Sequence, residues 1–392
     1  MPKTELEEIV IPKDLQEFLG DIVEKRHGFR LGDPWKYSET ALAVVVPILR
    51  GQAPERPYIT MYEVLKQMGI KDSGHVSGVE IQNKTGKAVF VRAGTIFTGA
   101  TQSRAAENST VIQPGKTEIP VRCVHQTHGI QSGSEMKFGD IAPMSVTMNL
   151  ISQAGQGAVW DSVRSYTGGD RDYHMSCLVQ NDDAFHHTAG PMRYSLTPEH
   201  RNRRNLSSIN DCGFYGNSSS GKSYSGNSYS GNDSNHYFVG AVFDGGSGSG
   251  HGTDDLLGYM NKVNGGRDVI NDMLQKVPLF EDQVGAIVFN PVGVVAVETF
   301  DHPMSWEAIK KEVIEKFGDK VTQEQAEHLF ELKPDKILPA IKKFIEGLKK
   351  NHEHTVRKDD KSETRVVIGD GLVGEYTLVK DRVIHAIIVR EN

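Results

Sequence analysis

The stretch from Val76 to Val124 carries the strongest β-strand pattern in the chain and most restricts the folds that the chain can adopt. Val79–Ile81 and Ala88–Val91 flank turn-forming residues, which predicts a β-hairpin. Ser109–Ile112 and Glu118–Val124 flank a Pro-Gly turn in the same way. Successive strands this close together leave no room for crossover helices. They therefore indicate an antiparallel meander or sandwich rather than a βαβ arrangement.

Further strands are expected on both sides of this stretch. The apolar run Ala41–Leu49 is far too short to span a membrane, and it predicts a buried strand. Val284–Asn290 and Val292–Phe300 predict a hairpin across Pro291. Because an isolated hairpin is only marginally stable in water, we expect the C-terminal strands to rejoin the main sheet. These strands are Arg365–Ile368, Gly374–Val379 and Val383–Val389.

Helical patterns are concentrated at the N-terminus and after residue 300. A helix from Asp14 to Gly28 begins with a capping residue and has one apolar face. Three helices are expected after residue 300: Ser305–Phe317, one capped at Thr322, and Asp335–Lys349. The spacing of Thr60 and Glu63 is that of a capping box and predicts a short helix. Two weaker helical patterns lie at Ser145–Gln153 and Val159–Tyr166. The predicted fold class is therefore α+β, with a dominant antiparallel β-sheet or β-sandwich core and helices at the N-terminus and after residue 300.

The pattern of elements divides the chain into four segments. Residues 1–75 are expected to form a helix and strand segment that packs on the core, and residues 76–300 the main β-rich domain. Residues 301–350 are helical, and residues 351–392 hold the C-terminal strands. A low-complexity insertion at 213–235 contains Ser-Tyr-Ser-Gly-Asn twice. It is either a surface insertion that builds no core or a tyrosine-containing segment that docks on another subunit of a homo-oligomer.

Composition limits the partners and the compartment. The chain has 392 residues, of which 38% are hydrophobic, enough for a sizeable core. Its formal net charge of -7 argues against nucleic-acid binding, and the short basic run Glu199–Arg204 is interpreted as a solvated loop. The three cysteines fit no C-x-x-C motif, and the N-terminus lacks a signal-peptide pattern. Together these features predict a reduced, cytoplasmic protein that is not inserted in a membrane.

The densest polar constellation lies inside the β-rich stretch and just after it. Gly99, Gln102-x-Arg104, the strand that begins at Ser109, a Pro-Gly turn and the run Ile119–Val124 follow one another in this order. This order of motifs resembles the ARG and Rhodanese-Phosphatase-superfamily-associated protein domain, in which ARG stands for ADP-ribosylglycohydrolase. Softer similarities at Gln156–Asp161, Val292–Phe300 and Asp381–His385 extend the resemblance over Val76–Arg390.

The resemblance implies a link, through gene association, to ADP-ribose and NAD metabolism. The family usually has a glutamate two residues after the cysteine, where this chain has His125. The residues expected to bind a ligand are therefore taken from this block of the chain. They are Thr98, Gln102, Arg104, Glu107, Arg122, His125 and His128.

Gln102 and Arg104 are the central pair of this set. They are two residues apart, so their side chains lie on the same side of an extended segment. An amide beside a guanidinium suits a phosphate or carboxylate ligand. The alternative is that both side chains satisfy backbone groups of a buried loop between strands.

Nucleophilic and metal chemistry receive less support from the sequence. Cys123 lies in an apolar strand, where a free cysteine is usually a small buried hydrophobe. A catalytic role would need an adjacent base, such as His125, and an exposed thiolate. The histidines and aspartates that follow fit no ligand spacing, so we expect no metal site and interpret them as solvated side chains. They are His128, Asp182, Asp183, His186 and His187.

The sequence thus leaves two functions open and identifies no cofactor. The leading function, which rests largely on the resemblance, is the binding or processing of an ADP-ribose-derived, NAD-derived or other nucleotide-like ligand. The other is a non-catalytic assembly protein that forms homo-oligomers through sheet edges and the tract at 213–235.

Overall fold

The computed structural model describes residues 12–36, 43–99, 102–125, 132–168, 256–263, 280–317, 332–348 and 351–391. All of them belong to one compact unit, formed by Met1–Gln180 and Phe238–Asn392. The tract at 213–235, the helix expected at Thr322 and the residue His128 lie outside the described residues.

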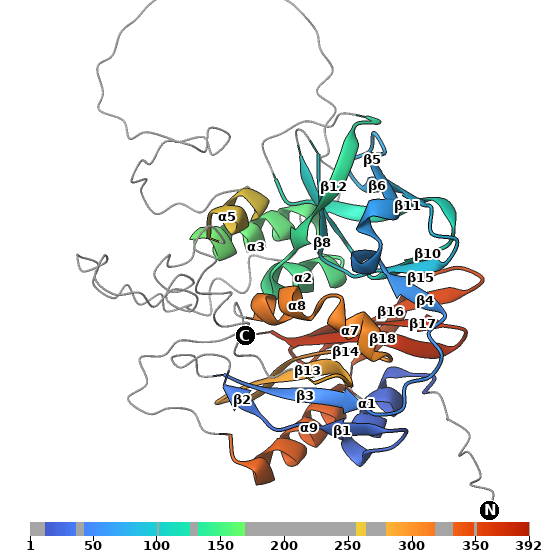
Figure 1. Ribbon diagram of the computed structural model, residues 1–392. Helices are drawn as coiled ribbons and strands as arrows, with labels where there is room; N and C mark the ends of the chain where they lie inside the picture. Colours follow the sequence, from blue (N-terminus) through green and yellow to red (C-terminus); the bar gives the residue numbers. More distant parts are fainter. Residues whose placement is uncertain are drawn as a thin grey trace, which may run out of the picture. The chain divides into compact units, whose positions relative to one another are not determined.

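A nine-stranded antiparallel sheet forms the larger part of the fold (Figure 1). It combines strands from the beginning, the middle and the end of the chain, because β3 pairs with β13 and β14 pairs with β18. In spatial order its strands are β1 (Phe29–Leu31), β3 (Val44–Arg50), β13 (Gln283–Asn290), β14 (Gly293–Phe300), β18 (Arg382–Arg390), β17 (Leu372–Val379), β16 (Ser362–Gly369) and β15 (His352–Lys358), with β2 (Trp35–Lys36) also paired to β3.

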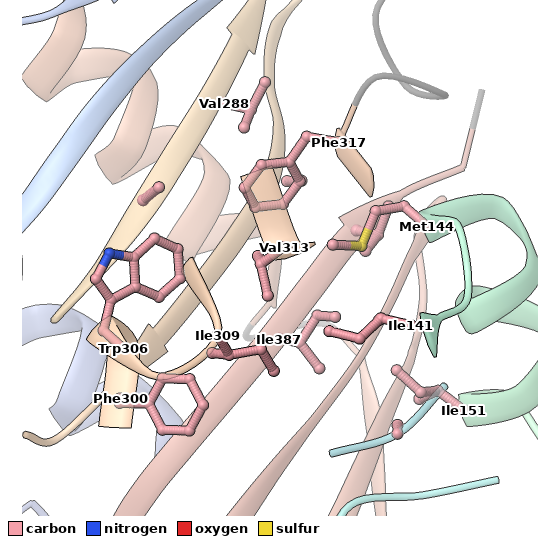
Figure 2. Close-up of a cluster of buried hydrophobic side chains, with 14 of the residues drawn as sticks. Ile141, Met144, Ile151, Val288, Phe300, Trp306, Ile309, Val313, Phe317 and Ile387 are labelled. Atoms are coloured by element: carbon pink, nitrogen blue, oxygen red, sulfur yellow. The ribbon is translucent and has the colours of Figure 1, made fainter. Parts of the chain in front are cut away.

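Both faces of this sheet are covered by apolar side chains of other elements. One face shares a core with two amphipathic helices, α1 (Leu15–Glu24) and α9 (Pro334–Leu348). The opposite face shares a second core with α2 (Met144–Ile151), α7 (Pro303–Glu307), α8 (Lys310–Lys316) and a small three-stranded sheet. Figure 2 shows part of this second core, in which Trp306, Ile309 and Phe317 lie close to the strands. The small sheet consists of β10 (Thr110–Ile112), β7 (Ala88–Val91) and β4 (Tyr58–Thr60).

The remaining strands close into a barrel, which leaves no free strand edge within it. Apolar residues of its strands, such as Phe97 and Val121, form a separate core. Two helices, α3 (Gln156–Gly168) and α5 (Leu256–Val263), contribute to a fourth core together with barrel residues. The barrel strands, in spatial order, are β11 (Gly115–Cys123), β6 (Gly78–Asn83), β5 (Met68–Asp72), β12 (Glu135–Ile141), β8 (Thr95–Thr98) and β9 (Ser103–Ala106).

The predicted fold class and several local predictions are confirmed. The fold is α+β with a dominant antiparallel sheet. Asp14 caps α1 by accepting a hydrogen bond from the backbone N–H of Glu17, and Thr60 and Glu63 form the capping box of a short 3₁₀ helix, Met61–Glu63. The hairpin across Pro291, the helices α2 and α3 and the three C-terminal strands are also present.

The predicted hairpin between Val79–Ile81 and Ala88–Val91 is wrong. The chain does reverse between them, but β6 pairs with β5 and β11 in the barrel, whereas β7 pairs with β10 and, in parallel, with β4. The side chain of Asn83 donates hydrogen bonds to the carbonyls of Lys87 and Ile112, which fixes the connecting loop to β10. Turn residues predict a reversal, but they do not decide which strands pair.

The helix expected from Ser305 to Phe317 is instead two short helices, α7 and α8. Ile309 lies between them with φ near -135° and ψ near -8°, outside the helical region. The interruption allows Trp306, Ile309 and Val313 all to lie in the core (Figure 2). In the described part of the chain, no helix combines the length and the apolar character needed to cross a bilayer.

Candidate functional site

The central candidate residues lie at one end of the barrel interior. Arg104 in β9 is paired with Phe97 in β8 on one side and with Cys123 in β11 on the other. Paired residues of antiparallel strands project to the same face of a sheet. Since Phe97 belongs to the barrel core, Arg104 and Cys123 also point inward.

The guanidinium of Arg104 is fully buried, and all of its nitrogens donate to protein acceptors. Its Nη2 donates to Oδ2 of Asp72 at 2.8 Å, and its Nε donates to Oε1 of Gln102 at 3.0 Å. Its Nη1 donates to the carbonyls of Gly78 at 2.7 Å and His75 at 2.9 Å. Arg104 therefore fastens the loop between β5 and β6 to the end of the barrel.

Gln102 and Gln156 complete this network around Cys123. Nε2 of Gln102 donates to Sγ of Cys123 at 2.9 Å, and the thiol donates to the carbonyl of His125 at 2.8 Å. The side-chain amide of Gln156 at the start of α3 forms two hydrogen bonds with the backbone of Cys123, as a neighbouring strand would. The result is a polar network that joins the four strands β5, β6, β9 and β11 to the helix α3.

Cys123 is poorly suited to act as a nucleophile. It is a free cysteine, and only 2% of its surface is exposed. Burial raises the pKa of its thiol, although the hydrogen bonds with His125 and Gln102 act in the opposite direction. A reactive cysteine needs an accessible thiolate, so this environment favours the buried, hydrophobe-like role.

The folded protein is expected to protect Cys123 from alkylation. At pH 8, native protein treated with iodoacetamide should remain unlabelled at this residue, and protein unfolded in urea should be labelled completely. Peptide-resolved mass spectrometry separates Cys123 from the other two cysteines. Rapid labelling of Cys123 in the native protein would contradict this assignment.

The candidates Thr98, Glu107 and Arg122 lie outside this network, whereas His125 belongs to it through its backbone carbonyl. Glu107 and Arg122 form an ion pair of 2.6 Å, in which both side chains keep some exposed surface. Burial raises the pKa of Glu107, while the charge of Arg122 opposes the rise. Thr98 ends β8, is partly exposed and accepts a hydrogen bond from Ser103 at 3.2 Å. The structure thus brings Gln102 and Arg104 together with Cys123 in the interior and leaves Thr98, Glu107 and Arg122 partly accessible.

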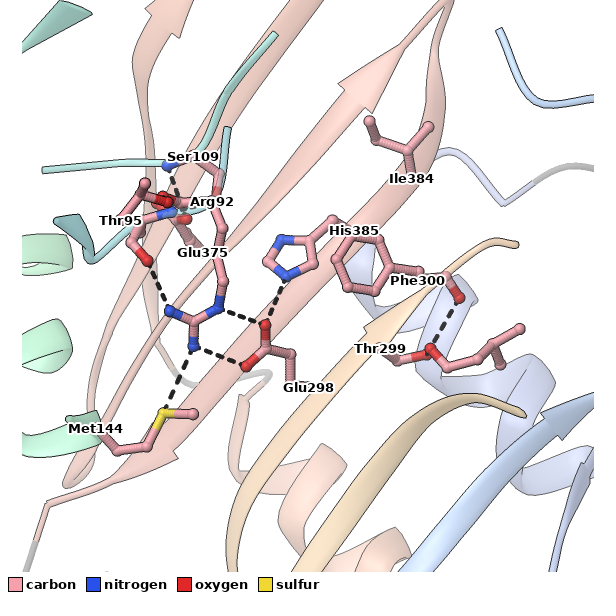
Figure 3. A network of polar contacts seen from close by, with 12 residues as sticks. Arg92, Thr95, Ser109, Met144, Glu298, Thr299, Phe300, Glu375, Ile384 and His385 are labelled. Atoms are coloured by element: carbon pink, nitrogen blue, oxygen red, sulfur yellow. Dashed lines mark hydrogen bonds and ion pairs between the residues drawn. The ribbon is translucent and has the colours of Figure 1, made fainter. Parts of the chain in front are cut away.

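A second buried cluster, not predicted from the sequence, lies between the small sheet and the nine-stranded sheet (Figure 3). Arg92, which follows β7, makes two hydrogen bonds to the carboxylate of Glu298 in β14, at 2.6 and 2.8 Å. Nε2 of His385 in β18 lies 3.2 Å from the same carboxylate. None of these three side chains has any exposed surface.

A further carboxyl group, Glu375 in β17, belongs to the same interface. Its Oε1 accepts a hydrogen bond from the backbone N–H of Ser109 at 2.9 Å, and its Oε2 accepts one from the side chain of Asn108 at 3.2 Å. Glu375 is also completely buried. This part of the interface therefore contains two carboxyl groups, Glu298 and Glu375, and Glu298 holds the arginine in a bidentate pair.

Comparison of the sequence with models of protein families shows to which family the chain belongs. The model of the ARG and Rhodanese-Phosphatase-superfamily-associated Protein domain matches residues 28–187 and 241–389. The chain belongs to this family. Comparisons with curated proteins and with solved structures gave no match. The family name records an association with two enzyme superfamilies and states no ligand or reaction.

Both buried clusters lie within the part of the chain that matches the family domain. Arg104 and Cys123 are in the first matched segment with Arg92, and Glu298 and His385 are in the second. Each of Glu298, Glu375 and His385 is a polar, ionisable residue in the interior of a mostly apolar strand. Buried charges need partners, so this pattern was the sequence signal for the second cluster.

The described part of this family domain contains no cluster of side chains that could bind a metal ion. No group of three or more His, Cys, Asp or Glu side chains there is arranged to hold a metal ion. The candidate residues that the structure describes thus form a buried network around Arg104 and a partly exposed ion pair, Glu107–Arg122.

Proposed function

We propose that this chain is a non-catalytic assembly protein that forms homo-oligomers, and that its polar constellation maintains the fold. The observation that carries this proposal is the environment of Arg104. Its Nε, Nη1 and Nη2 atoms all donate to protein acceptors, and its side chain is fully buried. A phosphate or carboxylate ligand would need these same donors.

Two features support assembly. The strand β15 ends the nine-stranded sheet, pairs with β16, has no second partner strand among the described residues, and is mostly exposed. Its charged side chains, including Glu353 and Lys358, disfavour pairing of this edge with an arbitrary strand of another protein. A strand that pairs here would need complementary charges, which would make the pairing selective. The second feature is the tyrosine-containing composition of the tract at 213–235, which suits contact between subunits. We also propose a cytoplasmic location, which the free thiol of Cys123 supports.

Deletion of Asn217–Asn232 tests this proposal. Light scattering of the wild type is expected to give a multiple of the 43.3 kDa chain mass, and the deletion variant is expected to give a lower mass. A shuffled tract of the same length and composition is the matched control for loop length. A wild type of monomer mass at micromolar concentration, or an unchanged oligomer after the deletion, would contradict the proposal.

Binding of a nucleotide-derived ligand is the second candidate, and membership of the family supports it. Such a ligand would contact Thr98, Glu107 and Arg122, which keep some exposed surface, rather than Arg104. Calorimetric titration of the wild type with ADP-ribose and with NAD distinguishes the two candidates. Saturable heat that is lost in Arg122→Ala would favour ligand binding, and the absence of heat at millimolar ligand would favour assembly alone.

A further inference from the structure

The contact between the small sheet and the nine-stranded sheet places two carboxyl groups in one row of the larger sheet. Glu298 in β14 and Glu375 in β17 are both paired with Ile387 in β18, one from each side. Adjacent strands are about 4.8 Å apart, so the two glutamates are about 10 Å apart on the same face. We call Arg92, Asn108, Ser109, Glu298, Glu375 and His385 the charged junction.

The charged junction contains one cation for these two carboxyl groups. Arg92 is held by both oxygens of Glu298 and also donates to the carbonyl of Ala93 at 2.7 Å. His385 is packed between the rings of Phe90 and Phe300, and burial lowers its pKa, which favours the neutral imidazole, although the hydrogen bond and charge of Glu298 act in the opposite direction. Arg92 and Glu298 therefore neutralise each other, and an ionised Glu375 would leave the junction with a net buried negative charge.

The other groups that face Glu375 are uncharged. Those that hydrogen-bond to it are Asn108 and Ser109, both before β10, and the Ser109 carbonyl in turn accepts a hydrogen bond from Thr364 in β16. Asn108 contacts Oε2 of Glu375 through a side-chain amide, which offers either a donor or an acceptor. An amide nitrogen and an amide oxygen have nearly the same shape, so the group can turn over without disturbing its packing.

We propose that the Glu375–Asn108 pair is a proton-dependent switch that couples the small sheet to the nine-stranded sheet. When Glu375 is ionised, its two oxygens accept hydrogen bonds from the Ser109 N–H and the Asn108 amide nitrogen, which lie 2.9 and 3.2 Å from them. When Glu375 is protonated, its O–H donates to the Asn108 amide oxygen, which turns toward it, and the Ser109 bond remains. The junction is then neutral, and the two sheets are held together more tightly.

The electrostatics of the site support this proposal. Burial raises the pKa of Glu375 to about 7, despite the opposing hydrogen bonds from Ser109 and Asn108 and the charge of Arg92. The unfolded chain would have an ordinary carboxyl pKa near 4.5. Between these two values the folded state binds a proton that the unfolded state does not bind. Stability from this group is therefore fully present at acid pH and decreases as the pH rises from about 4.5 to about 7.

Comparison of the wild type with Glu375→Gln over pH 5–8 tests the switch. Glutamine resembles the protonated side chain, since its oxygen accepts from Ser109 and its N–H donates to the turned Asn108 amide. The folding equilibrium constant of the wild type should fall, relative to that of Glu375→Gln, on the order of 100-fold between pH 5 and 8. The matched control is Glu346→Gln, an exposed residue on α9, which should keep the wild-type pH dependence.

Infrared difference spectra of the wild type provide an independent test if Glu375→Gln fails to fold. A protonated buried carboxyl group should give a C=O band that disappears as the pH is raised through 7, and this band should be present in Glu346→Gln. Parallel pH dependences of the wild type and Glu375→Gln would overturn the proposal. The absence of any carboxyl band that titrates near neutral pH would also overturn it.

Discussion

Replacement of Arg92 by methionine is expected to lower the free energy of unfolding by about 3–5 kcal/mol, because Glu298 then stays buried without its cation. Burial by itself would raise the pKa of Glu298, but the charge and hydrogen bonds of Arg92 outweigh this and lower it to about 2. A carboxyl group with a lowered pKa stabilises the fold above its unfolded pKa and loses this contribution as the pH falls. Urea denaturation from pH 7 down to pH 3 should therefore show the difference between wild type and Arg92→Met shrinking with acidity.

Two variants show whether the loss comes from the unpaired charge. The double variant Arg92→Met, Glu298→Met removes both charges and should recover a large part of the stability that the single variant loses. Arg30→Met removes an arginine from an exposed pair with Asp282 and should cost less than about 1 kcal/mol. A single variant Arg92→Met that is as stable as Arg30→Met would contradict the buried-pair account.

Replacement of Arg104 by methionine is also expected to cost about 3–5 kcal/mol, since Asp72 and two loop carbonyls lose a fully buried partner. Arg122→Met on the same barrel is the matched control, because its pair with Glu107 is partly exposed, and it should cost about 1 kcal/mol or less. Thermal and urea denaturation measure both differences. If Arg104→Met melted like the wild type, Arg104 would not be the structural residue described above, and a binding role would regain support.

Helix caps and tight turns could be predicted from the sequence because they depend on residues that are close together in the chain. The cap at Asp14, the capping box at Thr60 and the hairpin across Pro291 each depend on residues within a few positions of one another. Strand pairing depends on residues that are far apart in the sequence, and the sequence did not indicate which distant strands pair. Nothing close to Ala88–Val91 indicates that this strand pairs in parallel with Tyr58–Thr60.

The candidate site shows what the sequence could and could not indicate. The spacing of Gln102 and Arg104 predicted that their side chains share one side, but their contact with Cys123 and the role of Asp72, which completes the network, carry no local signal. The charged junction was missed although its pattern was visible, with Glu298 and His385 each lying inside a mostly apolar strand. A lone charge in an apolar strand predicts a buried partner, but the sequence cannot name that partner when it lies in another sheet.

The mixed origin of the nine-stranded sheet has a consequence for synthesis of the protein. Strand β3 leaves the ribosome long before its partner β13, from which it is separated by more than half of the chain, and β14 must wait for β18. The barrel strands, by contrast, all lie between Met68 and Ile141. Since contacts between distant segments form slowly, the barrel can close during translation while β3 has only β1 and β2 as partners and its edge toward β13 stays unpaired. During that interval β3 is the segment of the nascent chain with the greatest need of a chaperone.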